Sequence, residues 1–514
     1  MTMLKGKKGA ASRFYDKSHV AKHREWRGLR DTGYDFLRWV MNLGAMAQFV
    51  TASPVRIMKG LLQYRWFGTY LASFNWVDEA MEGLRGPALR ISHTYMHTML
   101  KEAMKVFVEM LNGDRRFGEN DYDDRQVLLE QAMSVELVAG FPNLTPLLVE
   151  PFMGLMGAFV DQQLPAYYLD VMERFGLPSD SCRLSANAAG VAVSDDFPHN
   201  GACLIVNNMP CDSSTMKSRV IERRLELPVL AAALPMRWED ENTDVYAVTQ
   251  MKAAIRFIEE HTGEAFDEKA FMDMMGKHNA EVLAERERLQ LMRSEHAPFG
   301  GMAVHLFHIF LYAFSGGRVP SVLKTEEKCR RIAEKAIRRN INCMPKGRHR
   351  MLSWGGPACY NFPFPLWLYN CWGIVQIAEM DTFEGGVLIP TDSLESALVG
   401  VVKNFESSVM RRHLTGGYEH LLEFWEKAEE MNCDMVMMND DITCKGALGL
   451  SGVIAESEKG HPNIHVMWIS NDMFDHRTIS RQDMRDQVNE YMTTVMREEP
   501  LDESLLVFDD YEGW

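Results

Sequence analysis

The sequence predicts an α/β protein with two parallel-sheet domains, a helical block between them and a helical N-terminal extension. Two observations lead to this fold class. Short apolar runs of strand length alternate with helical segments, as in βαβ units. These runs fall into two groups, separated by a long stretch of helical pattern that contains VTQMKAAIRFIEEHTG and MGKHNAEVLAERERLQLMRSEH.

The candidate strands are short apolar runs separated by helical segments. We expect them to build two Rossmann/flavodoxin-like α/β domains, at residues 126–244 and 346–514, joined by helices at 245–345. The six candidate strands are residues 202–208, 228–235, 350–356, 373–380, 433–439 and 463–470.

Residues 1–125 are predicted to form the helical extension. Between residues 35 and 112, apolar residues recur at helical spacing in DFLRWVMNLGAMAQFV and HTYMHTMLKEAMKVFVEML. A stripe of methionine and aromatic residues like this one indicates helix packing more often than a cofactor site. The polar, glycine-containing segment 113–125 then predicts a linker.

The net charge, the number of cysteines and the apolar segments of the chain favour a cytoplasmic protein. The formal net charge of −16 argues against a surface that binds nucleic acid throughout. Nine cysteines, an odd number at wide spacing, do not resemble the framework of a secreted disulfide protein. The basic N-terminus lacks the apolar core of a signal peptide, and the most apolar stretch, residues 302–315, is too short to span a bilayer. We therefore expect no nucleic-acid partner and no membrane span.

Three cysteines lie on loops that precede helical stretches. Cys211 follows an apolar strand and precedes Asp-Ser-Ser, which are good N-cap residues. A thiol at this position lies near the positive end of a helix dipole, which lowers its pKa. Cys444 follows a strand and a polar turn, and Cys182 follows a turn and precedes small helical residues. In open α/β sheets, ligands bind at the carboxyl ends of strands.

The spacing of Cys182, Cys211 and Cys444 is too irregular for a zinc-finger pattern. It suits a metal centre assembled between domains, where thiolates favour iron–sulfur, zinc or copper. Cys359, which follows another strand among glycines and prolines, could be a fourth ligand, a substrate contact or neither. The other five cysteines lie in apolar or helical surroundings and are expected to be structural: Cys203, Cys329, Cys343, Cys371 and Cys433.

Six segments, taken in order, resemble one known family. They are SDSCRLSANAAG, IVNNMPCDSSTMKSRVIERRLELPVL, IEEHTGEAFDEKAF, RHRMLSWGGPACYNFP, DITCKGALG and PNIHVMWISNDMFDHRTISRQDMRDQVNEYM. The family is that of the 2-hydroxyacyl-CoA dehydratases, which includes the benzoyl-CoA reductase subunits. The likeness is greatest to the larger, α-type dehydratase subunit.

The resemblance implies a [4Fe-4S] cluster ligated by Cys182, Cys211 and Cys444, with the fourth iron position open to water or substrate. It implies a lyase that removes water from an (R)-2-hydroxyacyl-CoA through a ketyl radical anion. It also implies two partners, a smaller homologous subunit and an ATP-hydrolysing iron–sulfur activator. The absence of a GxxxxGK[ST] motif agrees with ATP being used by another protein.

Two other functions share these sequence features. One is a low-potential reductase subunit of the benzoyl-CoA reductase type, and the other is a non-catalytic iron–sulfur electron-transfer subunit. The proton-transfer residues and the acyl group are not assigned by the sequence. Asp212, Asp440 and Asp441 lie on the relevant loops, and Asn143 and Thr145 are the nearest polar residues in the segment before the first cysteine.

Four cations lie close in sequence to the predicted ligands. They could offset the charge of a cluster or contact the phosphates of CoA, or they could be solvated surface charges. They are Arg183, Lys217, Arg219 and Lys445.

Overall fold

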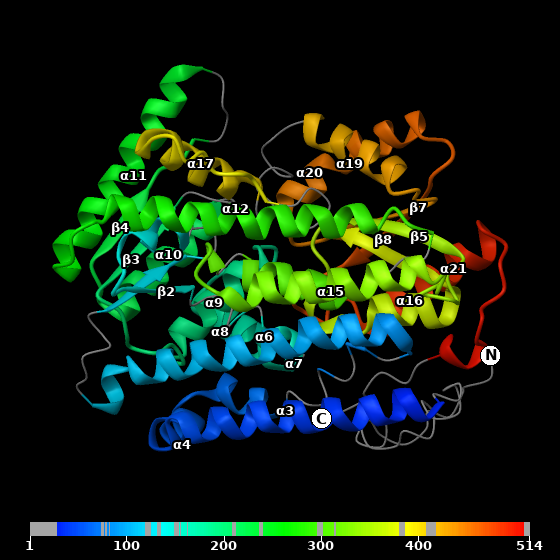
Figure 1. Cartoon of the computed structure of the whole chain (residues 1–514), viewed down its shortest axis with the longest axis horizontal. Helices are drawn as coiled ribbons and strands as arrows, with labels where there is room; N and C mark the ends of the chain where they lie inside the picture. The colour runs from blue at the N-terminus through cyan, green and yellow to red at the C-terminus, as the bar shows by residue number, and fades with distance from the viewer. Residues whose placement is uncertain are drawn as a thin grey trace.

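The structure is a computed structural model, shown in Figure 1. It describes residues 28–72, 77, 80–81, 83–118, 125–130, 135–148, 154, 156–161, 163–207, 212–235, 240–295, 302–312, 315–379, 386–407 and 418–507.

Two parallel sheets of four strands form the centre of the molecule. The first has the order β2-β1-β3-β4 and the second has the order β6-β5-β7-β8. This is the flavodoxin-like order in each case, and it confirms the predicted α/β class. The strands are β1 (Gln126–Leu129), β2 (Thr145–Leu148), β3 (Cys203–Asn207), β4 (Val229–Ala232), β5 (His349–Trp354), β6 (Ile374–Glu379), β7 (Met435–Asp441) and β8 (His465–Asn471).

All six strands expected from the sequence are present, and β1 and β2 were missed. β1 lies in an apolar run of only three residues, 127–129, whereas β4, which also has four residues, lies in the longer apolar run 228–235. β2 contains Pro146, which cannot donate a hydrogen bond to a neighbouring strand. Proline is tolerated there because β2 is an edge strand of its sheet.

Helices stack beside the sheets in roughly parallel layers (Figure 1). In this stack α12 contacts α15, α15 contacts α6, and α6 contacts α3. The helical N-terminal extension is thus confirmed. Its helices are α3 (Gly28–Ala52), α4 (Pro54–Gln63), η1 (Arg65–Ala72) and α6 (Gly86–Asn112). The predicted connecting region holds α11 (Glu241–Thr262), α12 (Glu268–Leu291), α13 (Met302–Phe307), η6 (His308–Tyr312) and α15 (Pro320–Arg338).

The remaining helices precede, connect or follow the strands of the two sheets. Those of the first half are η2 (Arg115–Phe117), η4 (Val135–Gly140), α7 (Met156–Val160), α8 (Gln163–Phe175), α9 (Arg183–Val193) and α10 (Asp212–Leu225). Those of the second half are η7 (Cys359–Asn361), α16 (Phe364–Trp372), α17 (Leu394–Ser407), α19 (Tyr418–Glu430), α20 (Lys445–Ser457), η8 (Glu458–Gly460), α21 (Arg481–Thr494) and η9 (Glu503–Leu505). None of the helices in the described part of the chain is both long and apolar enough to cross a membrane.

Helix α17 crosses between the halves of the chain. It follows β6 of the second sheet, yet it packs on α11 and α12. Its side chains Leu398 and Val401 belong to the same apolar cluster as Val127 of β1 and Ile205 of β3. The domain limits expected from the sequence remain a prediction.

The turn that leads into α15 is held by a buried carboxyl group on α12. Glu281 accepts hydrogen bonds from the hydroxyl of Ser315 at 2.8 Å and from the backbone N–H of Gly317 at 3.2 Å. Burial raises the pKa of Glu281 to about 7 from an ordinary value of 4.5. The neutral carboxyl is therefore the form that the folded protein favours at mildly acidic pH.

We expect Glu281→Gln to remove a pH-dependent loss of stability. The contribution of a carboxyl group with a raised pKa is fully present below its unfolded pKa and is lost as pH rises through about 7. A glutamine amide stays neutral, can accept from Gly317 and can donate to the Ser315 hydroxyl. From pH 5.5 to pH 8.5, the free energy of unfolding of the variant should rise by about 1–2 kcal/mol relative to that of wild type.

Thermal unfolding at both pH values measures this gain. Glu287→Gln is the matched control, because Glu287 lies on the same helix with a side chain 55% exposed. A stability difference between Glu281→Gln and wild type that does not change with pH would contradict the raised pKa.

Candidate functional site

Two of the predicted ligands are N-cap residues of helices. Cys182 caps α9, and Cys444 caps α20, where its sulfur accepts from the backbone N–H of Ala447 at 3.5 Å. Cys211 lies outside the described residues, and α10 begins at the next residue, Asp212. All three cysteines therefore adjoin helix N-termini, where unsatisfied N–H groups favour negative charge. This is the setting that the sequence predicted for thiolates.

An ion pair brings the loops of Cys182 and Cys444 together. The ammonium of Lys445, directly after Cys444, lies 2.9 Å from a carboxylate oxygen of Asp180, two residues before Cys182. The hydrogen bond from Lys445 lowers the pKa of Asp180. Both side chains are exposed, so the pair adds little stability by itself. The pair matters because it links the loop between α8 and α9, in the first half of the chain, to the loop that follows β7 of the second sheet.

Arg183 makes a second, buried connection between these parts of the chain. Its guanidinium lies 3.0 Å from Glu173 of α8, 3.4 Å from Asp472 and 3.6 Å from Asp475. The two aspartates are on the loop that follows β8. The sequence left open whether Arg183 offsets a cluster charge, contacts phosphates or is a solvated surface charge. In the structure it is buried and surrounded by these carboxylates.

The β8 loop is organised by its own aspartates. Asp472 accepts from the backbone N–H groups of Phe474 at 3.0 Å and of Asp475 at 2.8 Å, and burial raises its pKa. The pKa of Asp475 is lowered, because hydrogen bonds from Arg477 outweigh the opposing effect of burial. The sequence assigned no role to Asp472 or Asp475. The sequence feature that could have identified them is a pair of aspartates just after the carboxyl end of a predicted strand.

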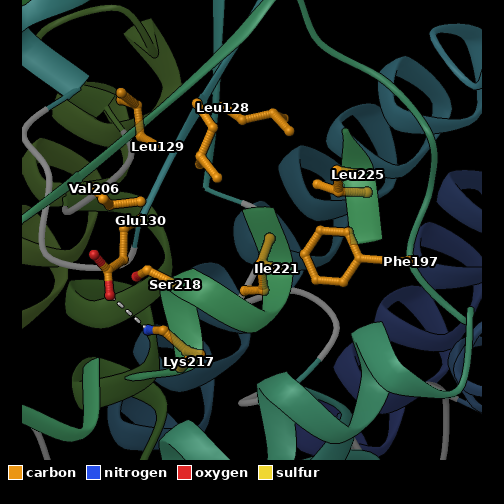
Figure 2. A pocket seen from close by; sticks show the side chains of 10 residues that line it. Leu128, Leu129, Glu130, Phe197, Val206, Lys217, Ser218, Ile221 and Leu225 are labelled. Atoms are coloured by element: carbon orange, nitrogen blue, oxygen red, sulfur yellow. Dashed lines mark ion pairs between the residues drawn. The ribbon is translucent and has the colours of Figure 1, made fainter. Parts of the chain in front are cut away.

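Lys217 anchors α10 to the first sheet (Figure 2). Its ammonium lies 2.8 Å from Glu130, which follows β1, and both side chains are buried. The other oxygen of Glu130 accepts from the backbone N–H of Asn207 at the end of β3, at 3.1 Å. The pair therefore sits where the winding of the sheet reverses, and it fixes the helix that begins after Cys211.

The cavity beside this ion pair is small. It lies between β1, β3 and α10, and its volume of about 20 Å³ is enough for about one water molecule. A CoA ester does not fit there. Of the other two cations, Arg219 and Lys445 are exposed, with side chains 63% and 70% accessible.

Cys359 occupies a different environment from Cys182 and Cys444. Gly355 ends the preceding strand with φ of +90°, and a Cβ there would lie 2.3 Å from the carbonyl oxygen of Asn439. The resulting turn buries the Cys359 side chain. Burial raises the pKa of this thiol well above its ordinary value, and the nearby carboxylate of Asp441 raises it further. The neutral thiol is favoured, and a ligand role for Cys359 remains a prediction.

The five cysteines expected to be structural are all buried. Burial raises the pKa of each thiol, so each is protonated at neutral pH. They are Cys203, Cys329, Cys343, Cys371 and Cys433.

The other polar residues considered from the sequence lie in two separate parts of the structure. Asp441 accepts from the N–H and the hydroxyl of Thr443 at 3.0 and 2.9 Å, which holds the turn before Cys444. Burial raises the pKa of Asp441 to about 7 and also raises that of Asp440. Asn143 and Thr145 precede or begin β2, so they lie at the amino edge of the sheet. The β3 strand end before Cys211 is at the opposite edge.

Among the residues that the structure describes, no group of three or more His, Cys, Asp or Glu side chains is arranged to hold a metal ion. Cys211, the third predicted ligand, is not among them.

Comparison with protein families supplies the decisive observation. Residues 149–493, more than half of the chain, match the family described as 2-hydroxyglutaryl-CoA dehydratase, D-component. The chain belongs to this family. The matched region of this D-component protein spans Cys182, Cys211, Cys359 and Cys444, and it starts after the helical extension. No curated protein matches the chain. The family identifies a dehydratase-type subunit.

Proposed function

We propose that this chain is the iron–sulfur subunit of a 2-hydroxyacyl-CoA dehydratase. Its substrate would be an (R)-2-hydroxyacyl-CoA, from which water is removed after one-electron reduction by an ATP-dependent activator. A smaller homologous subunit would complete the enzyme. The observation that supports this most is the match of residues 149–493 to the dehydratase D-component family. The Lys445–Asp180 ion pair, which joins the loop before α9 to the loop after β7, agrees with a site shared by Cys182 and Cys444.

The donor set fits an iron–sulfur cluster. Cys182, Cys211 and Cys444 would hold it, because thiolates are the ligands such clusters use. Each of these cysteines adjoins a helix N-terminus, whose partial positive charge offsets the negative charge of a thiolate. A cluster bound there would supply the low-potential electron that turns the thioester carbonyl into a ketyl radical anion, from which the α-hydroxide leaves.

The other residues of the site orient and support these ligands. Arg183 holds α9 against the β8 loop through carboxylates from both parts of the chain. Lys217 and Glu130 hold α10 against the carboxyl ends of β1 and β3. Lys445, next to Cys444, is paired with Asp180 and so links the Cys444 loop to the Cys182 loop.

Metal analysis of protein purified without oxygen tests the proposal. We expect about four iron and about four acid-labile sulfide per chain, with the broad absorption of an iron–sulfur protein. Zinc alone, or no metal, would contradict it. With partner and activator present, the hydroxyacyl-CoA ester should lose water without net consumption of reductant. Stoichiometric consumption would instead indicate a reductase.

A further inference from the structure

Helix α3 is apolar on two opposite faces. One face packs on α6 and buries Ala45, Met46 and Phe49. On the opposite face, exposed residues repeat at alternating spacings of four and three. They are Leu29, Gly33, Phe36, Val40, Leu43, Ala47 and Val50, here called the α3 stripe. A helix that is apolar all round is normally covered on all sides.

Helix α4, next along the chain, also has exposed apolar side chains. Val55, Met58 and Leu62 are 67%, 57% and 85% exposed. Within α3, Leu29 is 86% and Phe36 is 68% exposed, and the Phe36 ring stacks on Trp39. With Leu37, Trp39 and the larger side chains of the α3 stripe, these residues expose on the order of 1,000 Å², against about 300–600 Å² for the largest patch of a typical monomer.

The size of this surface matches one side of a stable protein interface, which buries about 800 Å² per partner. Its composition matches too. No charged residue occurs from Trp39 to Val55, and depletion of charge is typical of the cores of homodimer interfaces. The four–three spacing is that of a helix–helix seam, so the occupant that fits is another helix with the same spacing.

We propose that the α3 stripe pairs with the α3 stripe of a second copy of this chain, in antiparallel orientation. The charged residues of α3 are confined to its first half: Arg30, Asp31, Asp35 and Arg38. Antiparallel pairing places each charged half beside the partner's uncharged half and opposes the two helix dipoles. Parallel pairing would set like residues side by side.

This contact lies away from the helix that follows Cys444. Figure 1 shows α3 and α4 along the lower edge of the molecule, with α6 above α3, and α20 in the upper half of the view. The pairing does not depend on the proposed function, because neither helix carries a predicted ligand.

The mass of the full chain in solution at micromolar concentration tests the pairing. We expect a dimer for wild type and a monomer for the double variant Val40→Glu/Leu43→Glu. The matched control is Val245→Glu/Leu283→Glu, at exposed apolar residues of α11 and α12, which should stay dimeric. Circular dichroism should give the same folded signal for all three. A monomeric wild type would overturn the proposal, whether the stripe then binds a different subunit or a lipid surface, as would a dimeric double variant.

Cross-linking tests the orientation. Val40 is near the middle of the stripe, so Val40→Cys should form a disulfide with its own copy under mild oxidation. In Leu29→Cys the two thiols would lie about 30 Å apart along the helix pair, well beyond the roughly 7 Å that a disulfide allows between Cα atoms. Cross-linking of both variants, or of neither, would overturn antiparallel pairing.

Discussion

Cys444→Ala should reduce the iron content of anaerobically purified protein from about four atoms per chain to near zero. The replaced thiol is the N-cap of α20, and it sits on the loop that Lys445 joins to the Cys182 loop. Alanine has no atom that can bind iron, so only two of the three proposed thiolate ligands would remain. Cys182→Ala should have the same effect. The measurement is iron and sulfide per chain, with the absorption spectrum as a second readout.

Cys433→Ala and Cys371→Ala are the matched controls for this loss. Both thiols are buried, and burial raises the pKa of each to about 12. Each substitution removes one buried sulfur, and it should cost stability at the level of about 1 kcal/mol while leaving iron unchanged. Loss of iron from either control, with Cys182, Cys211 and Cys444 intact, would refute the ligand assignment.

Arg183→Met should destabilise the fold by about 3–5 kcal/mol, because it leaves buried carboxylates without their cation. The side chains of Asp472 and Asp475 are 0% and 3% exposed, and that of Arg183 is 7% exposed. Asp475 keeps Arg477 as a partner, so most of the cost should fall on Asp472. Chemical denaturation of wild type and variant measures the change.

Arg219→Met is the control, since Arg219 is exposed and, among the residues that the structure describes, its ion pair is with Glu222 of the same helix. Its cost should not exceed about 1 kcal/mol. Adding Asp472→Asn to Arg183→Met should restore part of the loss by removing the unpaired charge. If Arg183→Met is as stable as Arg219→Met, the buried connection between α9 and the β8 loop does not stabilise the fold.

The sequence allowed most of the framework to be predicted, because parallel strands buried on both faces are continuous apolar runs. Residues 202–208 and 463–470 were identified in this way and correspond to β3 and β8. β1 was not identified because its apolar run, 127–129, has only three residues, and β2 was not identified because Pro146 argues against a strand.

The position of a cysteine before a helix could also be predicted, because it depends on neighbouring residues in the sequence. A thiol directly before a helical segment is visible in the sequence, and the helices beginning after Cys182 and Cys444 follow it. Side-chain partners were not visible. Arg183 is 289 residues from Asp472 and Lys445 is 265 residues from Asp180, so neither pair has a local signal.

The sequence by itself determined the fold class, six of the eight strands, the helical extension and the family, because all of these depend on residues that are close together along the chain. Only the tertiary structure decided which charges are buried against one another, which edge of the sheet Asn143 lies at, and that α3 leaves an apolar face uncovered. These depend on how distant segments pack, and the free energy of a buried charge or an exposed apolar side chain is set by that packing.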